Sequence, residues 1–87
     1  MTQEQYNKAI EISEKIKCLE EVQKEINYPN YDHKLAYTER SQIGHNNDWR
    51  PCRYMDSISD ILDKYDKMIR QEIKDRIEEF KKQIEEL

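Results

Sequence analysis

The sequence predicts a mainly α protein, built from two long antiparallel amphipathic helices joined by a central β-hairpin or extended arm. Apolar residues recur at helical spacing near both ends of the 87-residue chain, a pattern typical of amphipathic helices. The middle of the chain, residues 28–54, holds both prolines, the only glycine and the only tryptophan. We expect one small domain over residues 1–87, a coiled-coil-like helical hairpin that assembles into a homo-oligomer.

The first helix is expected over residues 3–27. Thr2 and Gln5 have the spacing of a capping box, in which each side chain bonds the other residue's backbone amide,. Pro29 disfavours helical backbone at Tyr28, so the helix should end before that residue,. The apolar stripe of this helix consists of Tyr6, Ala9, Ile10, Ile12, Ile16, Leu19, Val22 and Ile26.

The central arm, residues 28–54, is interpreted as a hairpin. Residues 34–43 alternate weakly in the manner of a strand, and residues 44–48 have the composition of a turn,. Residues 49–54 then return as a second strand, which Pro51 confines to an edge,. A short helix over residues 32–42 is the alternative, because Leu35 and Ala36 tolerate helical backbone well,.

The second helix is expected over residues 57–87, beginning at Asp56 or Ser57, with Ser57 and Asp60 at capping-box spacing,. A helix of this length spans roughly 46 Å, which is longer than a compact chain of this size is wide. Its apolar face therefore needs an extended hairpin or another chain as a partner. The apolar positions, about 3.6 residues apart on average, are Ile58, Leu62, Tyr65, Ile69, Ile73, Ile77, Phe80, Ile84 and Leu87.

Composition favours self-association and argues against several other partners. Apolar residues make up 36% of the chain and charged residues 39%, so a second copy is the simplest source of additional core. Oppositely charged residues four apart, such as Glu11 with Lys15 and Glu72 with Arg76, indicate solvated helix faces,. The net charge of −4 argues against an extended duplex nucleic acid as a partner.

A cytoplasmic location without a membrane partner is expected. No apolar stretch approaches the ~18 residues that indicate a membrane span. The first residues lack the charged and apolar regions of a signal peptide,. Cys18 and Cys52 form no close-spaced motif, which is typical of reduced thiols in a cytosolic protein,.

The candidate ligand- or partner-binding residues lie in the central arm. Arginine side chains bind phosphate or carboxylate with two parallel hydrogen bonds, and aromatic faces stack on bases. Residues 28–54 carry a net charge of +1 within a chain of −4. Packing at an oligomer interface explains the same composition, since Tyr, Trp and Arg are enriched there. The predicted residues are Arg40, His45, Asn47, Trp49, Arg50, Arg53 and Tyr54.

No cofactor, metal or catalytic site is expected. A metal site built from His33, His45, Asp48 and Cys52 would lack the short paired ligand spacing of structural zinc sites,. Cys52 follows His45 by seven residues without the glycine-rich turn that positions a nucleophile,. We therefore expect a protein that is not an enzyme.

Three functions fit these features. The first is a small oligomeric interaction protein that binds a protein partner through the central arm, by analogy a phage or mobile-element inhibitor of a host protein. The second is a sponge that sequesters a nucleotide-type anionic small molecule between subunits. The third is a structural coiled-coil module without a ligand site.

Overall fold

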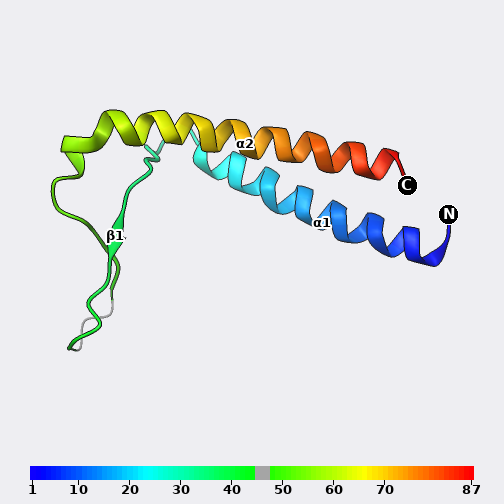
Figure 1. Cartoon of the computed structure of the whole chain (residues 1–87), viewed down its shortest axis with the longest axis horizontal. Helices are drawn as coiled ribbons and strands as arrows, with labels where there is room; N and C mark the ends of the chain where they lie inside the picture. Colours follow the sequence, from blue (N-terminus) through cyan, green and yellow to red (C-terminus); the bar gives the residue numbers. More distant parts are fainter. Residues whose placement is uncertain (45–47) are drawn as a thin grey trace. The chain divides into compact units, whose positions relative to one another are not determined.

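The computed structural model describes residues 1–44 and 48–87, and these are mainly helical (Figure 1). The prediction of two helices with a hairpin between them is confirmed. Contacts divide the chain into two compact units, a helical unit (Met1–His33 with Ile69–Leu87) and a hairpin unit (Lys34–Met68). The elements in order are α1 (Gln3–Ile26), β1 (Thr38–Glu39), β2 (Arg50–Pro51), the 3-10 helix η1 (Met55–Ile58) and α2 (Ser59–Glu85).

In the helical unit, α1 and the C-terminal part of α2 run antiparallel, with both chain termini at the same end (Figure 1). The predicted capping box is present. The Gln5 amide donates to the Thr2 hydroxyl over 3.1 Å, and the Thr2 amide donates to the Gln5 side-chain oxygen over 2.9 Å. The helix α1 ends at Ile26 with Asn27 as its C-cap, one residue earlier than expected.

The core of the helical unit is formed by three buried isoleucines, Ile12, Ile16 and Ile77. Other members of the two predicted stripes are less enclosed, since Tyr6 and Ile10 keep 54% and 43% of their surface exposed. The stripes are therefore wider than the interface that buries them. The half-buried residues packed against the three isoleucines are Leu19, Ile73, Phe80 and Ile84.

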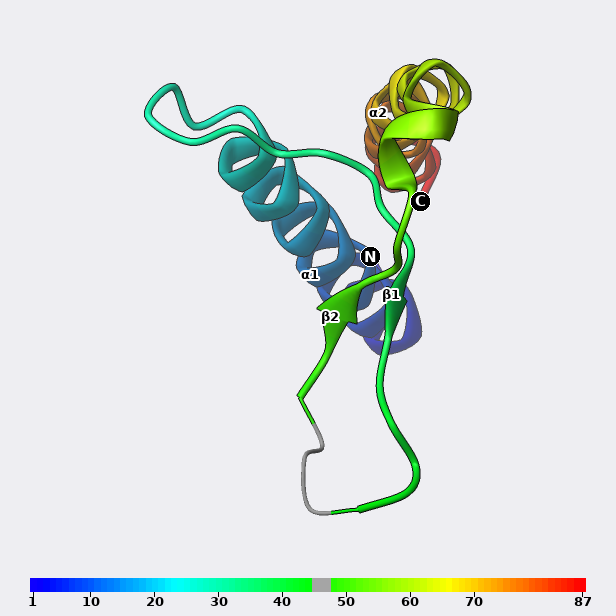
Figure 2. The ribbon, with the colours of Figure 1, turned by 90° about the vertical axis from the view of Figure 1, so that its left-hand side faces the viewer.

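In the hairpin unit, β1 and β2 pair antiparallel, with Thr38 opposite Pro51 and Glu39 opposite Arg50 (Figure 2). The Cys52 amide donates to the Tyr37 carbonyl over 3.0 Å, in the same register. Hydrogen-bonded and non-hydrogen-bonded pairs alternate in an antiparallel ladder, so Pro51 occupies a position where no ladder bond is lost. Residues 32–42, all of which the structure describes, are not helical, so the alternative of a short helix is wrong.

The start of the second helix differs from the prediction. Ser57 does not cap α2, because it lies within η1 and α2 begins at Ser59. Its hydroxyl instead donates to the Tyr54 carbonyl over 2.7 Å, and its amide donates to the same oxygen over 3.0 Å. A bond from residue i+3 back to residue i makes a 3-10 turn. The side chain that was expected to begin the α-helix therefore closes a tighter turn before it.

We predict that Ile77→Ala lowers the free energy of unfolding by about 2–4 kcal/mol. The side chain is 5% exposed and packs with Ile12 and Ile16, so truncation leaves a cavity. Urea denaturation measures the change. The matched control is Ile43→Ala at an 89% exposed position, where the effect should stay within about 0.5 kcal/mol. Equal losses in the two variants would contradict this account of the core.

Candidate functional site

The hairpin brings four residues together as two cross-strand pairs. The Arg40 guanidinium lies over the Trp49 ring, 5.2 Å from its centroid. The Arg50 Nε atom lies 3.3 Å from the Glu39 carboxylate. Successive residues of an extended strand point to opposite faces. The two pairs therefore project from opposite faces of the ribbon, and Arg40 and Arg50 do not converge on one point.

The two arginines have different electrostatic surroundings. Arg50 is partly neutralised by Glu39, in an ion pair whose side chains are 74% and 49% exposed, so the pair contributes little to stability. Arg40 is held by the π-face of Trp49, an attraction that leaves the edges of the guanidinium group able to donate hydrogen bonds,. Of the two, Arg40 is therefore better placed to contact an anionic group.

Tyr54 combines backbone strain with an exposed side chain. Its φ of 63° and ψ of 24° place it in the left-handed region, which costs a residue with a Cβ about 1–2 kcal/mol,. The ring is 82% exposed, so side-chain burial does not offset this cost. Strained backbone of this kind is concentrated at functional sites. The exposed Arg53 immediately precedes it.

Five of the seven predicted site residues can be located. Trp49 is paired with Arg40, Arg50 is paired with Glu39, and Arg53 and Tyr54 lie where the hairpin meets η1. His45 and Asn47 lie outside the described residues. The located residues line the two faces and the base of the hairpin.

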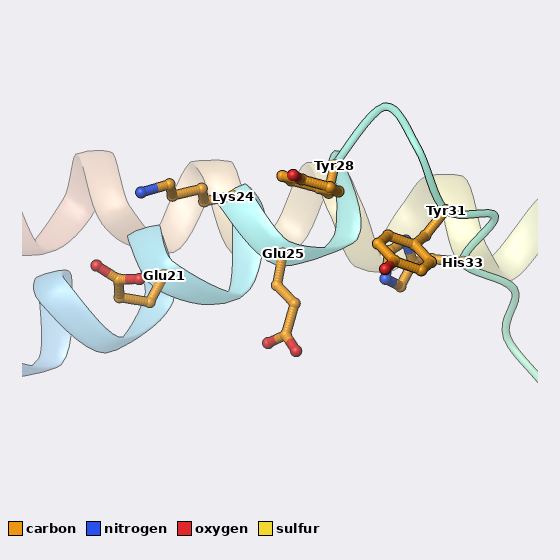
Figure 3. Close-up of a pocket in the computed structure, with 6 residues that line it drawn as sticks. All are labelled: Glu21, Lys24, Glu25, Tyr28, Tyr31 and His33. Atoms are coloured by element: carbon orange, nitrogen blue, oxygen red, sulfur yellow. The ribbon is translucent and has the colours of Figure 1, made fainter.

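A second candidate site, which we call the helix-end pocket, lies at the C-terminal end of α1 (Figure 3). Its volume is about 390 Å³. From the sequence, Glu21, Lys24 and Glu25 were expected on a solvated helix face and Tyr28, Tyr31 and His33 in the central arm, and no pocket was expected here. The residues that line the pocket are Glu21, Lys24, Glu25, Tyr28, Tyr31 and His33.

Two aromatic rings and a histidine form one side of the helix-end pocket. The rings of Tyr28 and Tyr31 are tilted by 31°, with centroids 5.6 Å apart. The Nδ1 atom of His33 is buried and has no hydrogen-bond partner among the described residues. Lys24 and Glu25 leave α1 in different directions, with the Glu25 carboxylate on the opposite side of the helix from the Lys24 ammonium (Figure 3).

Arg70 of α2 fixes the turn that carries the pocket. Its Nη1 atom donates to the Ile26 carbonyl over 3.3 Å and to the Asn27 side-chain oxygen over 3.0 Å. Its Nη2 atom donates to the His33 carbonyl over 3.4 Å. A cation at a helix C-terminus is favoured by the helix dipole and satisfies carbonyls that lack helical partners. One guanidinium group thus joins the end of α1 to the far end of the turn.

Among residues 1–44 and 48–87, no group of three or more His, Cys, Asp or Glu side chains is arranged to hold a metal ion. Cys18 and Cys52 are both free thiols. Within the same residues, no helix has the length and apolar character that crossing a membrane requires. No protein-family model matches the chain, and neither a curated protein nor a solved structure shows significant similarity to it.

We predict that Arg70→Ala lowers the free energy of unfolding by about 1–3 kcal/mol, because hydrogen bonds from a charged donor to three acceptors are lost,. Amide hydrogen exchange in residues 27–33 should accelerate. Arg76→Ala is the matched control on the same helix, since Arg76 pairs with exposed Glu72 over 3.1 Å and should contribute at most about 0.5 kcal/mol. Unchanged exchange in residues 27–33 would contradict the role given to Arg70.

We also predict that Tyr54→Gly raises thermal stability relative to Tyr54→Ala. Glycine adopts the left-handed conformation without the Cβ penalty, whereas alanine retains it,. The difference in free energy of unfolding should be about 1 kcal/mol in favour of glycine. Thermal denaturation of the two variants measures it. An alanine variant as stable as the glycine variant would show that this backbone position is not strained.

Proposed function

We propose that this chain is a non-enzymatic interaction protein whose hairpin arm, residues 34–54, binds an acidic protein surface that offers apolar pockets. The observation that carries the proposal is the exposure of large apolar side chains on this arm. Tyr37, Ile43, Trp49 and Tyr54 are 67%, 89%, 65% and 82% exposed. Aromatic and arginine side chains supply much of the binding energy at protein interfaces.

The charge of the arm supports an acidic partner. Residues 34–54 contain four basic and two acidic side chains, although the whole chain carries a net charge of −4. Opposite charge on the partner accelerates association and fixes orientation, while the apolar side chains supply affinity. Arg40, held over Trp49, offers an aromatic surface and a positive charge at one place.

A second candidate function is capture of a nucleotide-type anionic small molecule. The observation that favours it is the Arg40–Trp49 stack, which presents both a cation and a ring on which a base can stack,. It is supported less well than protein binding, because Arg50 projects from the other face and is paired with Glu39. A pocket for such a ligand therefore needs side chains from a second subunit.

We further propose that the chain forms a homo-oligomer through α2. Ile61, Tyr65 and Met68 lie on three successive turns of the same face of this helix and are 50%, 48% and 56% exposed,. A second copy is the proposed occupant of this face, because few side chains are buried within the described part of one chain. The buried side chains there are those of Ile12, Ile16, Leu62 and Ile77. Packing of α2 against α2 would give the coiled-coil-like assembly.

We predict that Trp49→Ala weakens binding to the protein partner at least tenfold. The partner is first captured from cells on immobilised wild-type protein, identified by mass spectrometry, purified and titrated by calorimetry. The loss is expected because a large ring that becomes buried on binding is removed. Tyr6→Ala is the control, since it truncates an aromatic ring that is 54% exposed on α1. The affinity should also fall as salt concentration rises.

Three results would overturn this proposal. Equal affinities of the Trp49→Ala and wild-type proteins would remove the arm from the interface. A partner with a basic binding surface would contradict the charge argument. A nucleotide that raises the midpoint of thermal unfolding of the wild-type protein, but not of Arg40→Ala, would favour the second candidate function.

A further inference from the structure

The helix-end pocket has an electrostatic preference that follows from its position. It contains Glu21 and Glu25 against a single cation, Lys24. The C-terminal end of α1 beside it is already bonded by the Arg70 guanidinium. The two carboxylates of the lining therefore carry the preference for a positively charged ligand. The Glu25 carboxylate points away from the Lys24 ammonium (Figure 3), so the lysine does not cover it.

The aromatic pair suits an organic cation with an apolar stem. A cation within about 6 Å of a tyrosine ring is attracted by its π-face. Tyr28 and Tyr31 present two such rings, 5.6 Å apart and tilted by 31°. An inorganic cation would gain less from these rings, because its strongly held hydration shell would separate it from them.

His33 adds a requirement for a hydrogen-bond donor. Its Nδ1 atom is buried without a partner among the described residues, and a buried polar atom without a hydrogen bond is destabilising. In neutral histidine protonated at Nε2, Nδ1 accepts a hydrogen bond. The backbone of His33 is held in place by the bond from Arg70 to its carbonyl. A ligand N–H group would satisfy this acceptor once the groups that cover it move aside.

We propose that the helix-end pocket binds a primary alkylammonium group. The Glu21 and Glu25 carboxylates attract the charge, the Tyr28 and Tyr31 rings contact the alkyl stem, and His33 Nδ1 accepts one N–H after the groups that cover it move aside. Two sources share this chemistry, the lysine side chain of a protein and a free aliphatic polyamine. This site is separate from the hairpin arm and does not depend on the function proposed for that arm.

The test titrates full-length protein with n-butylammonium chloride and follows the ring NMR signals of Tyr28, Tyr31 and His33. We expect these signals to shift in a saturable manner. The Glu21→Gln/Glu25→Gln variant should weaken the affinity at least fivefold. The Glu11→Gln/Glu14→Gln variant is the control, because it removes two exposed carboxylates of α1 outside the pocket, and its affinity should stay within twofold of wild type.

A second probe tests the hydrogen bond to His33. n-Butyltrimethylammonium carries the same charge and the same alkyl stem but has no N–H, so it should bind at least threefold more weakly than butylammonium. Equal affinity of these two cations, or unchanged affinity in Glu21→Gln/Glu25→Gln, would overturn the proposal. Titration with spermidine and with a blocked Gly-Lys-Gly peptide distinguishes the two sources. Tighter binding of the peptide supports a protein lysine, and tighter binding of spermidine supports a free polyamine.

Discussion

The contact on which the helical unit depends is the packing of Ile12 and Ile16 of α1 against Ile77 of α2. Two helices that meet along one seam can exclude water only from the residues nearest that seam, so much of each apolar stripe stays exposed. Arg70 then joins the end of α1 to the turn that follows it. The unit is therefore held by a short apolar seam together with a charged group that bonds backbone oxygens at one end.

The hairpin unit has a different kind of stability. Its described strands are two residues each, and a two-stranded ribbon is marginally stable alone. Hydrogen bonds at the base of the hairpin supply part of the stability that the short strands lack. The Tyr37 amide donates to the Met55 sulfur over 3.4 Å, and Ser57 holds the Tyr54 carbonyl. These bonds join the residue before β1, and the residue before η1, to η1 at the base of the hairpin, while Tyr37, Trp49 and Tyr54 keep most of their surface exposed.

Local signals in the sequence were sufficient for the elements but not for their contacts. The Thr2–Gln5 capping box involves residues three apart, so its spacing alone predicted the start of α1. The Ser57 hydroxyl can form a hydrogen bond three residues forward, as a helix cap, or three residues back, to the Tyr54 carbonyl. The sequence spacing is the same in both cases and does not decide between them. The bonds of Arg70 join residues 37 to 44 positions apart. No periodicity indicates such partners, and the helix-end pocket was missed for the same reason.

The position of Pro51 makes the two edges of the hairpin unequal. In a non-hydrogen-bonded pair the backbone N–H and C=O groups point away from the partner strand. Thr38 therefore presents a donor on the outer edge of β1, whereas Pro51, opposite it, has no N–H to present on the outer edge of β2. An incoming strand can form a regular ladder beside β1 and would leave a carbonyl unpaired beside β2. A further strand can thus be added beside β1 but not regularly beside β2, which limits uncontrolled growth of the sheet by edge-to-edge pairing of further chains.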